Sequence, residues 1–102
     1  MRNTGIKDSV IYEIIELAKK YNLDKVILFG SRARGDFQRA SDIDLAVSGG
    51  DIAMFAIDVE EETSTLLQFD VIDLDKDLQD NLLKSIREEG ILLYEKVWKL
   101  RC

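Results

Sequence analysis

The chain has 102 residues, of which 46% are hydrophobic and 33% charged, a size and composition that indicate one globular domain over 1–102. Its net charge of −6 argues against a module that binds nucleic acid by neutralising phosphates. The chain contains no histidine, which excludes histidine general bases, His–Zn sites and Ser-His-Asp triads. No apolar run approaches the ~20 residues of a membrane span. The only cysteine is Cys102, so we expect no internal disulfide and a cytoplasmic location.

The first third of the chain predicts a helix followed by a buried strand. Apolar residues recur at helical spacing over 8–21, with Asp8 or Ser9 as the expected N-cap and Asn22 as a left-handed residue that ends the helix. The apolar run 26–29 closes at a glycine, which is typical of a strand buried on both faces.

The remaining elements follow from the same rules. Asp51 is the expected cap of the next long helix. Its apolar stripe includes Leu66. The expected elements are a helical turn at 31–34, a loop at 35–41, a strand at 43–47, a helix at 52–67, a strand at 69–74, a helix at 76–89, a strand at 91–94 and a helical extension at 96–100. This order predicts an α/β fold in which a small mixed sheet of about four strands packs with three helices.

Three carboxylates stand out on the predicted strands. Asp42 and Asp44 are two residues apart, so they project from the same face of one strand. If the strand at 69–74 lies beside it, Asp70 joins them, although Asp73 competes for this role. Carboxylates held this close favour a hard divalent cation, most plausibly Mg²⁺, and three of them can bridge two ions.

The spacing of these residues resembles a known family. Gly30-Ser31 precedes Asp42-Ile43-Asp44 by ten residues, and Ala33-Arg34-Gly35 and Ser41 flank the two ends of the interval. This pattern, with Asp70 on a later strand, resembles the minimal nucleotidyltransferases (MNT), the smallest branch of the DNA polymerase beta-like superfamily. The resemblance covers nearly the whole chain and implies the palm-type nucleotidyltransferase fold.

The resemblance also implies a function. Members of this family act as antitoxins beside a HEPN-domain toxin, and at least some transfer AMP from ATP to a tyrosine hydroxyl of that partner. Here Asp42, Asp44 and Asp70 are then the catalytic and metal-binding residues, and Gly30, Ser31 and Arg34 bind the nucleotide. Arg32 and Arg39 are equally plausible phosphate contacts, although each of the three arginines is more simply read as a solvated charge. A hetero-oligomer with the toxin is expected, without direct contact to nucleic acid or membrane.

Other functions stay open at this point. The chain is compatible with a non-catalytic antitoxin that masks its partner, which its acidic surface suits. It is also compatible with transfer to a small-molecule hydroxyl such as that of an aminoglycoside, although little chain remains to build a second pocket. RNA tailing is a weaker alternative, because the chain is not basic.

Overall fold

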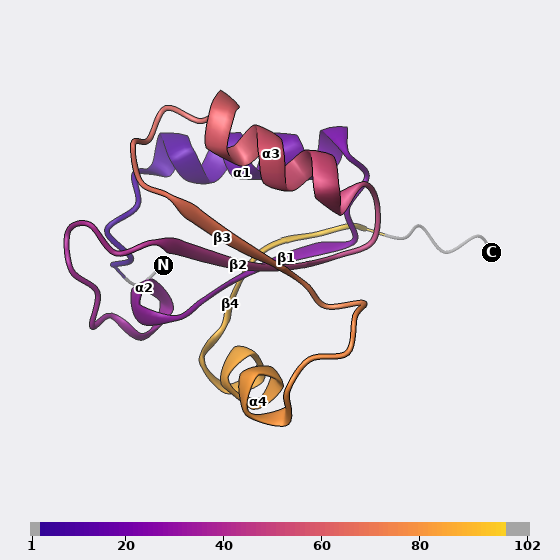
Figure 1. The fold of residues 1–102 in the computed structure, drawn as a ribbon. Coiled ribbons are helices and arrows are strands. Elements are labelled where there is room, and N and C mark those ends of the chain that lie inside the picture. Colours follow the sequence, from indigo (N-terminus) through magenta and orange to yellow (C-terminus); the bar gives the residue numbers. More distant parts are fainter. Residues whose placement is uncertain (1–2, 98–102) are drawn as a thin grey trace.

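A computed structural model of the chain describes residues 3–97 (Figure 1). It confirms the predicted α/β class with four strands, and the helical turn at 31–34 is a fourth, short helix. The elements are α1 (Asp8–Lys20), β1 (Lys25–Phe29), α2 (Ser31–Arg34), β2 (Ile43–Ser48), α3 (Ile52–Glu62), β3 (Phe69–Asp73), α4 (Asp80–Glu89) and β4 (Ile91–Glu95).

The four strands form one mixed sheet in the order β3-β2-β1-β4. β1 pairs antiparallel with both β2 and β4, whereas β2 and β3 are parallel. A parallel pair needs a crossover connection, and α3 supplies it between β2 and β3. The parallel pairing is what brings the N-terminal ends of β2 and β3 to the same end of the sheet, where β1 ends.

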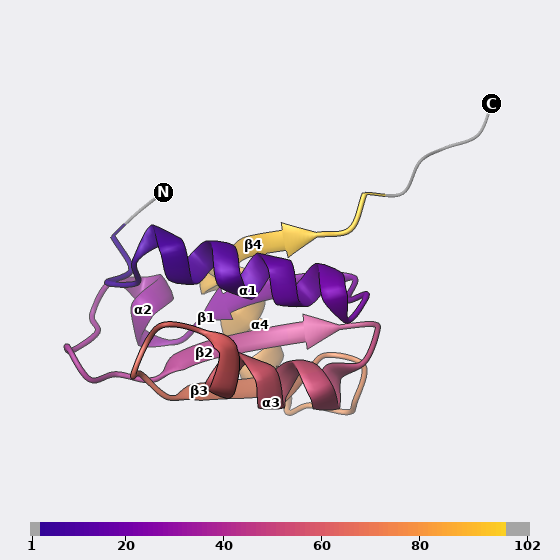
Figure 2. The ribbon, with the colours of Figure 1, turned by 90° about the horizontal axis from the view of Figure 1, so that it is seen from above.

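The helices form two layers of unequal size. α1 and α3 lie side by side over one face of the sheet, and α4 lies on the other (Figures 1 and 2). The hydroxyl of Tyr21, at the end of α1, donates to the buried carboxylate of Asp58 in α3 and so joins the two helices. The main core fills the space between these helices and the sheet; its buried members are Val10, Ile14, Leu17, Ala18, Leu23, Val26, Leu28, Ala33, Ile43, Leu45, Val47, Phe55 and Val59.

A smaller cluster lies on the α4 face. Phe29 of β1, Ala46 of β2 and Ile86 of α4 are its buried members, and Ile72 of β3 packs against them. Side chains alternate along a strand, so residues two positions before Ala46 and Ile72 also belong to this face. Those residues are Asp44 and Asp70.

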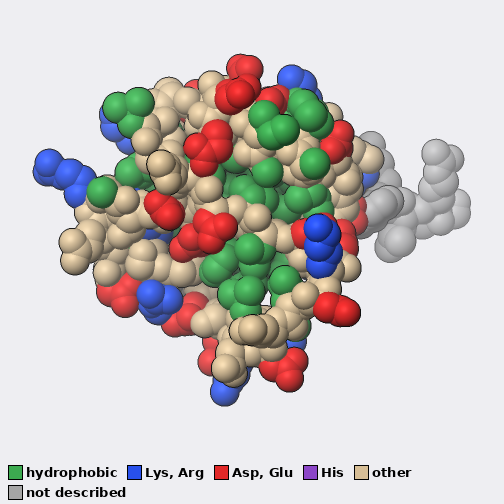
Figure 3. Space-filling view, viewed as in Figure 1, with side chains coloured by type: hydrophobic (Ala, Val, Ile, Leu, Met, Phe, Trp, Pro, Cys, Tyr) green, Lys and Arg blue, Asp and Glu red, His purple; other side chains and the backbone are tan. Residues whose placement is uncertain are grey.

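The edge at β3 faces the viewer in Figure 3. Hydrophobic side chains gather near the centre of this face at the level of the sheet, and charged side chains of both signs lie around them. Charges around an open strand edge oppose pairing with another chain. In the described part of the chain, every helix falls short of the length and apolarity that a membrane span requires.

Two predicted helices are longer than the real ones. The helix expected at 52–67 ends at Glu62, and Leu66 is fully exposed instead of buried. It ends because the Thr63 hydroxyl donates to the Val59 carbonyl and Thr63 itself is extended. The helix expected at 76–89 begins only at Asp80, because the segment before it forms a turn in which the Asp75 amide donates to Asp73.

Two end predictions also need correction, and two are confirmed. α1 begins after Lys7 with no side-chain cap, so neither Asp8 nor Ser9 is its N-cap. Asn22 has the expected positive φ, and Asp51 caps α3 by accepting from the Met54 amide. The helical extension expected at 96–100 is absent at 96–97, and the rest of it and Cys102 lie outside the described residues.

Candidate active site

The turn between β1 and α2 brings its backbone directly against one of the candidate carboxylates. Gly30 has φ 77° and ψ −158°, a conformation that favours glycine. A Cβ atom at this position would lie 2.1 Å from Oδ2 of Asp44. Two separate features therefore require glycine at position 30: its positive φ, and the Asp44 carboxylate that a Cβ atom would meet.

The carboxylates of Asp44 and Asp70 belong to neighbouring strands in register. Asp44 of β2 is the Cα partner of Asp70 in parallel β3 and of Phe29 in β1. Asp42 precedes the strand by one residue and is exposed, Asp44 is half-buried and Asp70 is exposed. The condition set by the sequence, that the third strand lies beside the second, is therefore met.

The charges of Asp42 and Asp70 act on the carboxylate of Asp44. Burial raises the pKa of Asp44, and the negative charges of Asp70 and Asp42 raise it further, while Arg34 and Arg32 oppose the shift. A carboxylate in this position prefers either a proton or a cation.

The chemistry of the donor set fits a hard divalent cation, because the groups are carboxylate oxygens alone. Within residues 3–97, no three acidic side chains converge closely enough to form a ready-made metal cage. Asp42, Asp44 and Asp70 are the residues that would hold such an ion, which remains a prediction.

Asp73, the alternative to Asp70, lies elsewhere. It is an odd number of positions from Asp70, so it belongs to the opposite face of β3. Its register partner is Val47, and its Oδ1 accepts the Asp75 amide at 2.8 Å. Asp73 therefore supports a turn at the far end of the strand.

Arg34 lies at the end of α2 and reaches the same region. Its Nε is 3.2 Å from Asp36 Oδ2, and its Nη1 is 3.8 Å from Glu89 of α4. The hydrogen bond to Asp36 raises the pKa of Arg34, and Glu89 and Asp44 raise it further. An exposed guanidinium near Asp44 suits the predicted role as a phosphate contact, but its present partners are carboxylates.

Arg32 differs from the expected solvated charge, because only 1% of it is exposed. Its guanidinium donates to three carbonyls: Ser41 at 2.8 and 3.0 Å, Arg39 at 3.1 Å and Thr4 at 3.0 Å. It also lies 5.0 Å from the centre of the Phe37 ring. Arg32 therefore fixes the loop that leads into Asp42. The sequence gives no signal for this role.

This arrangement joins acidic side chains to a Gly-Ser turn at one end of the sheet, and the comparison with known families agrees. The pattern described as "Polymerase beta, Nucleotidyltransferase" matches residues 12–97. The chain belongs to this nucleotidyltransferase family. The predicted fold and the predicted enzyme class are confirmed by this match.

Individual relatives narrow the similarity further. The chain is 32% identical over 100 residues to a "Putative protein adenylyltransferase" of Methanocaldococcus jannaschii, covering 86% of this chain and 98% of the relative. A solved "toxin-antitoxin with AMP-PNP" is 26% identical with a TM-score of 0.69, covering 84% of this chain and 73% of that one. A mutant of the MntA-HpeT toxin-antitoxin is 25% identical with a TM-score of 0.65, covering 83% and 72%. These matches confirm the resemblance to minimal nucleotidyltransferases of toxin–antitoxin systems.

Proposed function

We propose that this nucleotidyltransferase is an antitoxin that transfers AMP from ATP to a tyrosine hydroxyl of a HEPN-type toxin. The observation that carries the transfer is the placement of Asp44 and Asp70 in register beside the Gly30-Ser31 turn. The protein acceptor is supported by the relative named as a protein adenylyltransferase, and the antitoxin role by the toxin–antitoxin structures.

In the proposed reaction, the tyrosine oxygen forms a bond to the α-phosphorus of ATP, and the bond between that phosphorus and the bridging oxygen to the β-phosphate breaks. Pyrophosphate leaves with the electron pair, and the carboxylate of Asp70 accepts the hydroxyl proton. Gly30 lets the phosphates approach the backbone, and the first amides of α2 and the hydroxyl of Ser31 are donors to them. Arg34 offers its positive charge at the edge of the site.

Asp42, Asp44 and Asp70 would hold Mg²⁺, as two ions. The metal would neutralise the triphosphate of ATP and lower the pKa of the acceptor hydroxyl. The ionised carboxylate of Asp44 is held against the Gly-Ser turn by its strand neighbours, so its position does not depend on a flexible loop. Asp42, by contrast, depends on the loop that Arg32 fixes.

The shape of the site also favours a macromolecular acceptor over a small molecule. Asp42 and Asp70 are exposed, so the candidate acceptor side of the site is open to solvent. A small acceptor such as an aminoglycoside needs a concave pocket at the reacting atoms. A protein acceptor that docks across an open site encloses the reacting atoms with its own residues.

Intact-protein mass spectrometry tests this function. The proposed HEPN-type toxin is incubated with this chain, Mg²⁺ and each nucleoside triphosphate in turn. We expect a mass gain of one or more AMP groups with ATP, absent with Asp44→Asn and lost when the acceptor tyrosine is replaced by phenylalanine. A stable complex without any mass gain would contradict transfer and favour a masking antitoxin.

A further inference from the structure

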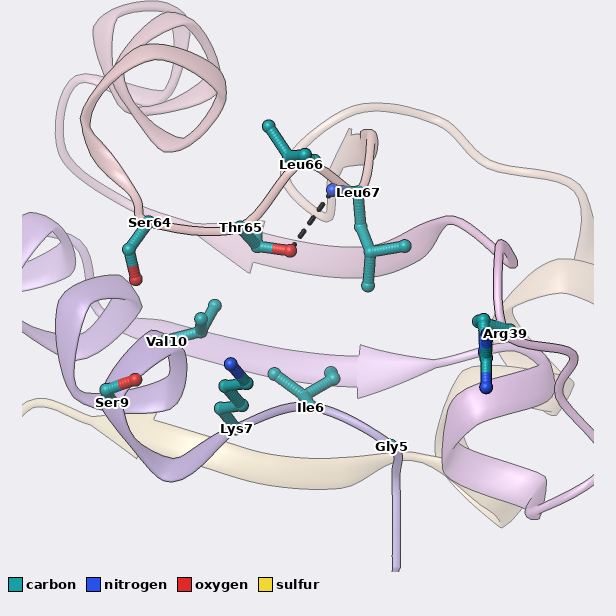
Figure 4. A pocket seen from close by; sticks show the side chains of 10 residues that line it. All are labelled: Gly5, Ile6, Lys7, Ser9, Val10, Arg39, Ser64, Thr65, Leu66 and Leu67. Carbon is teal, nitrogen blue, oxygen red and sulfur yellow. Dashed lines mark hydrogen bonds between the residues drawn. The ribbon is translucent and has the colours of Figure 1, made fainter.

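A hollow of about 550 Å³ lies at the same end of the sheet as the carboxylates, on the face covered by α1 and α3 (Figure 4). One side is formed by Gly5, Ile6, Lys7, Ser9 and Val10, the other by residues 64–67, and Arg39 closes one end. In Figure 4, Ile6 and Val10 point toward Leu67 across the hollow. The mechanism proposed above uses none of these residues.

The charge of the hollow is opposite to that of the chain. Among the described residues that line it, Lys7 and Arg39 are cations and none carries a carboxylate. The whole chain has 20 acidic and only 14 basic residues. An apolar hollow between two cations therefore selects a segment that carries an apolar side chain and negative charge.

An exposed leucine stands at the rim of the hollow. Leu66 is fully exposed, and the loop that carries it is held in place by side chains. Glu13 of α1 accepts from both the amide and the hydroxyl of Ser64 at 2.9 Å, and the Thr65 hydroxyl accepts from the Leu67 amide at 3.1 Å. A large apolar side chain presented by a fixed loop loses little conformational entropy when a partner covers it.

Hydrogen bonds connect the opposite side of the hollow to the loop that leads into Asp42. Arg32 donates to the carbonyl of Thr4, directly before Gly5, and also to the carbonyls of Arg39 and Ser41. Asp42 follows Ser41. A ligand that rests between Gly5 and Arg39 therefore contacts the same hydrogen-bonded frame that positions Asp42.

We propose that this hollow is a docking site for the acceptor protein, and that its occupant is a segment with an aliphatic or aromatic side chain between acidic residues. The apolar side chain covers Leu66, Ile6 and Leu67, while the carboxylates pair with Lys7 and Arg39. This inference rests on the proposed function in one respect, that the acceptor is a protein. Docking here leaves the opposite face free for the reacting hydroxyl.

A peptide probe tests the docking site without any transfer reaction. The probe is an acetylated, amidated peptide of the order Glu-Asp-Leu-Phe-Asp-Glu, titrated into the isotopically labelled chain and followed by amide NMR. We expect shifts at residues 5–10, 39 and 64–67, lost with Leu66→Ser or with Lys7→Glu combined with Arg39→Glu. Two matched controls should bind normally: Leu92→Ser, another exposed leucine on β4, and Lys76→Glu, an exposed lysine at the far end of β3.

A kinetic measurement with the modified acceptor provides the second test. We expect Leu66→Ser to raise KM for the acceptor about tenfold, as loss of an interface anchor does, with kcat and the KM for ATP unchanged. Lys7, Arg39 and Leu66 are all exposed, so the variants at these positions should fold normally.

Three results would overturn the docking site: no shifts at the hollow with the acidic peptide, equal shifts with a peptide in which lysine replaces each acidic residue, or an unchanged KM for Leu66→Ser. Shifts that grow with protein concentration without peptide would assign the hollow to a second copy of the chain and also overturn it. If no acceptor is modified, the proposed function fails. The peptide titration still tests the docking site, because it does not depend on any transfer reaction.

Discussion

Asp44 carries a free-energy cost in the folded chain. Burial and the charges of Asp70 and Asp42 raise its pKa above the ordinary value of about 3.8, so the folded state binds this proton more readily than the unfolded chain does. Stability therefore falls as the pH rises through the raised pKa, and the ionised carboxylate destabilises the fold at neutral pH. Such a cost is typical of a group that is kept for its chemistry.

The variant Asp44→Asn should separate chemistry from folding. It removes the charge and keeps the shape, so transfer should be lost while the free energy of unfolding at pH 7 rises by roughly 0.5 kcal/mol, the scale of a partly exposed charge interaction. Urea unfolding measures this, and the gain should shrink as the pH falls through the raised pKa of Asp44, where the native carboxyl group binds its proton. A variant that is less stable than the native chain at pH 7 would contradict the assigned electrostatics.

Arg32 is the residue whose role the sequence conceals most completely. Its carbonyl partners belong to Thr4, Arg39 and Ser41, so only the folded backbone brings them to one guanidinium. Nothing in the local pattern distinguishes it from Arg34, which is two residues away and exposed.

Replacing Arg32 by lysine should destabilise the fold despite the conserved charge. An ammonium cannot satisfy three carbonyls in this planar arrangement, so Arg32→Lys should lower the free energy of unfolding by about 2–3 kcal/mol. The matched variant Arg34→Lys should change stability little, because Arg34 is exposed. Urea unfolding of the two variants checks this, and equal stability of both would show that the buried hydrogen bonds contribute nothing.

At the scale of elements, the turn between β1 and α2 was predictable and the end of α3 was not. An apolar run closed by Gly30-Ser31 specifies its turn within a few residues. The loop at 63–68 instead depends on Glu13, which is 51 residues from Ser64 in the chain. Helical periodicity continues through Leu66, so the local pattern does not reveal that Thr63 ends the helix and that Glu13 holds the loop after it.

The two glycines at the ends of α2 offer a matched test of the turn. Both Gly30 and Gly35 have positive φ, but a Cβ at Gly30 meets Asp44 at 2.1 Å and a Cβ at Gly35 meets no atom within 4 Å. Each alanine variant should lose about 1 kcal/mol of stability from backbone strain. Gly30→Ala should also displace Asp44 and lower the transfer rate by about a hundredfold, as misplaced catalytic groups do.

Thermal unfolding and the initial rate of pyrophosphate release measure the two effects separately. Transfer by Gly35→Ala should stay near that of the native chain. If Gly30→Ala and Gly35→Ala were equally active, the contact between the turn and Asp44 would have no part in catalysis.

At the scale of the whole molecule, the sheet order decides which carboxylates meet. The sequence predicted four strands and the pair Asp42 and Asp44, because both patterns are local. It favoured Asp70 over Asp73 through the family resemblance, since strand pairing and facing depend on the packed sheet. The parallel register of β2 and β3 places Asp70 beside Asp44, whereas Asp73 pairs with Val47.

Metal binding should therefore stabilise the whole fold through these strands. A ligand that binds only the native state at tenfold its dissociation constant adds about 1.4 kcal/mol to the free energy of unfolding. We expect Mg²⁺ to raise the melting temperature of the native chain, and EDTA to reverse the rise. Asp73→Asn, on the opposite face, should respond as the native chain does, whereas Asp70→Asn should respond less. An equal response of all three proteins would contradict the assigned ligands.

The central claim is that this site transfers a nucleotidyl group, and the fate of each ATP phosphate tests it most directly. The proposed toxin partner is incubated with the native protein, Mg²⁺ and ATP labelled at either the α- or the γ-phosphate. The account predicts that label from the α-phosphate alone enters the partner, that label from the γ-phosphate appears in pyrophosphate, and that Asp44→Asn abolishes both. Label from the γ-phosphate on the partner, or α-label that persists with Asp44→Asn, would contradict it.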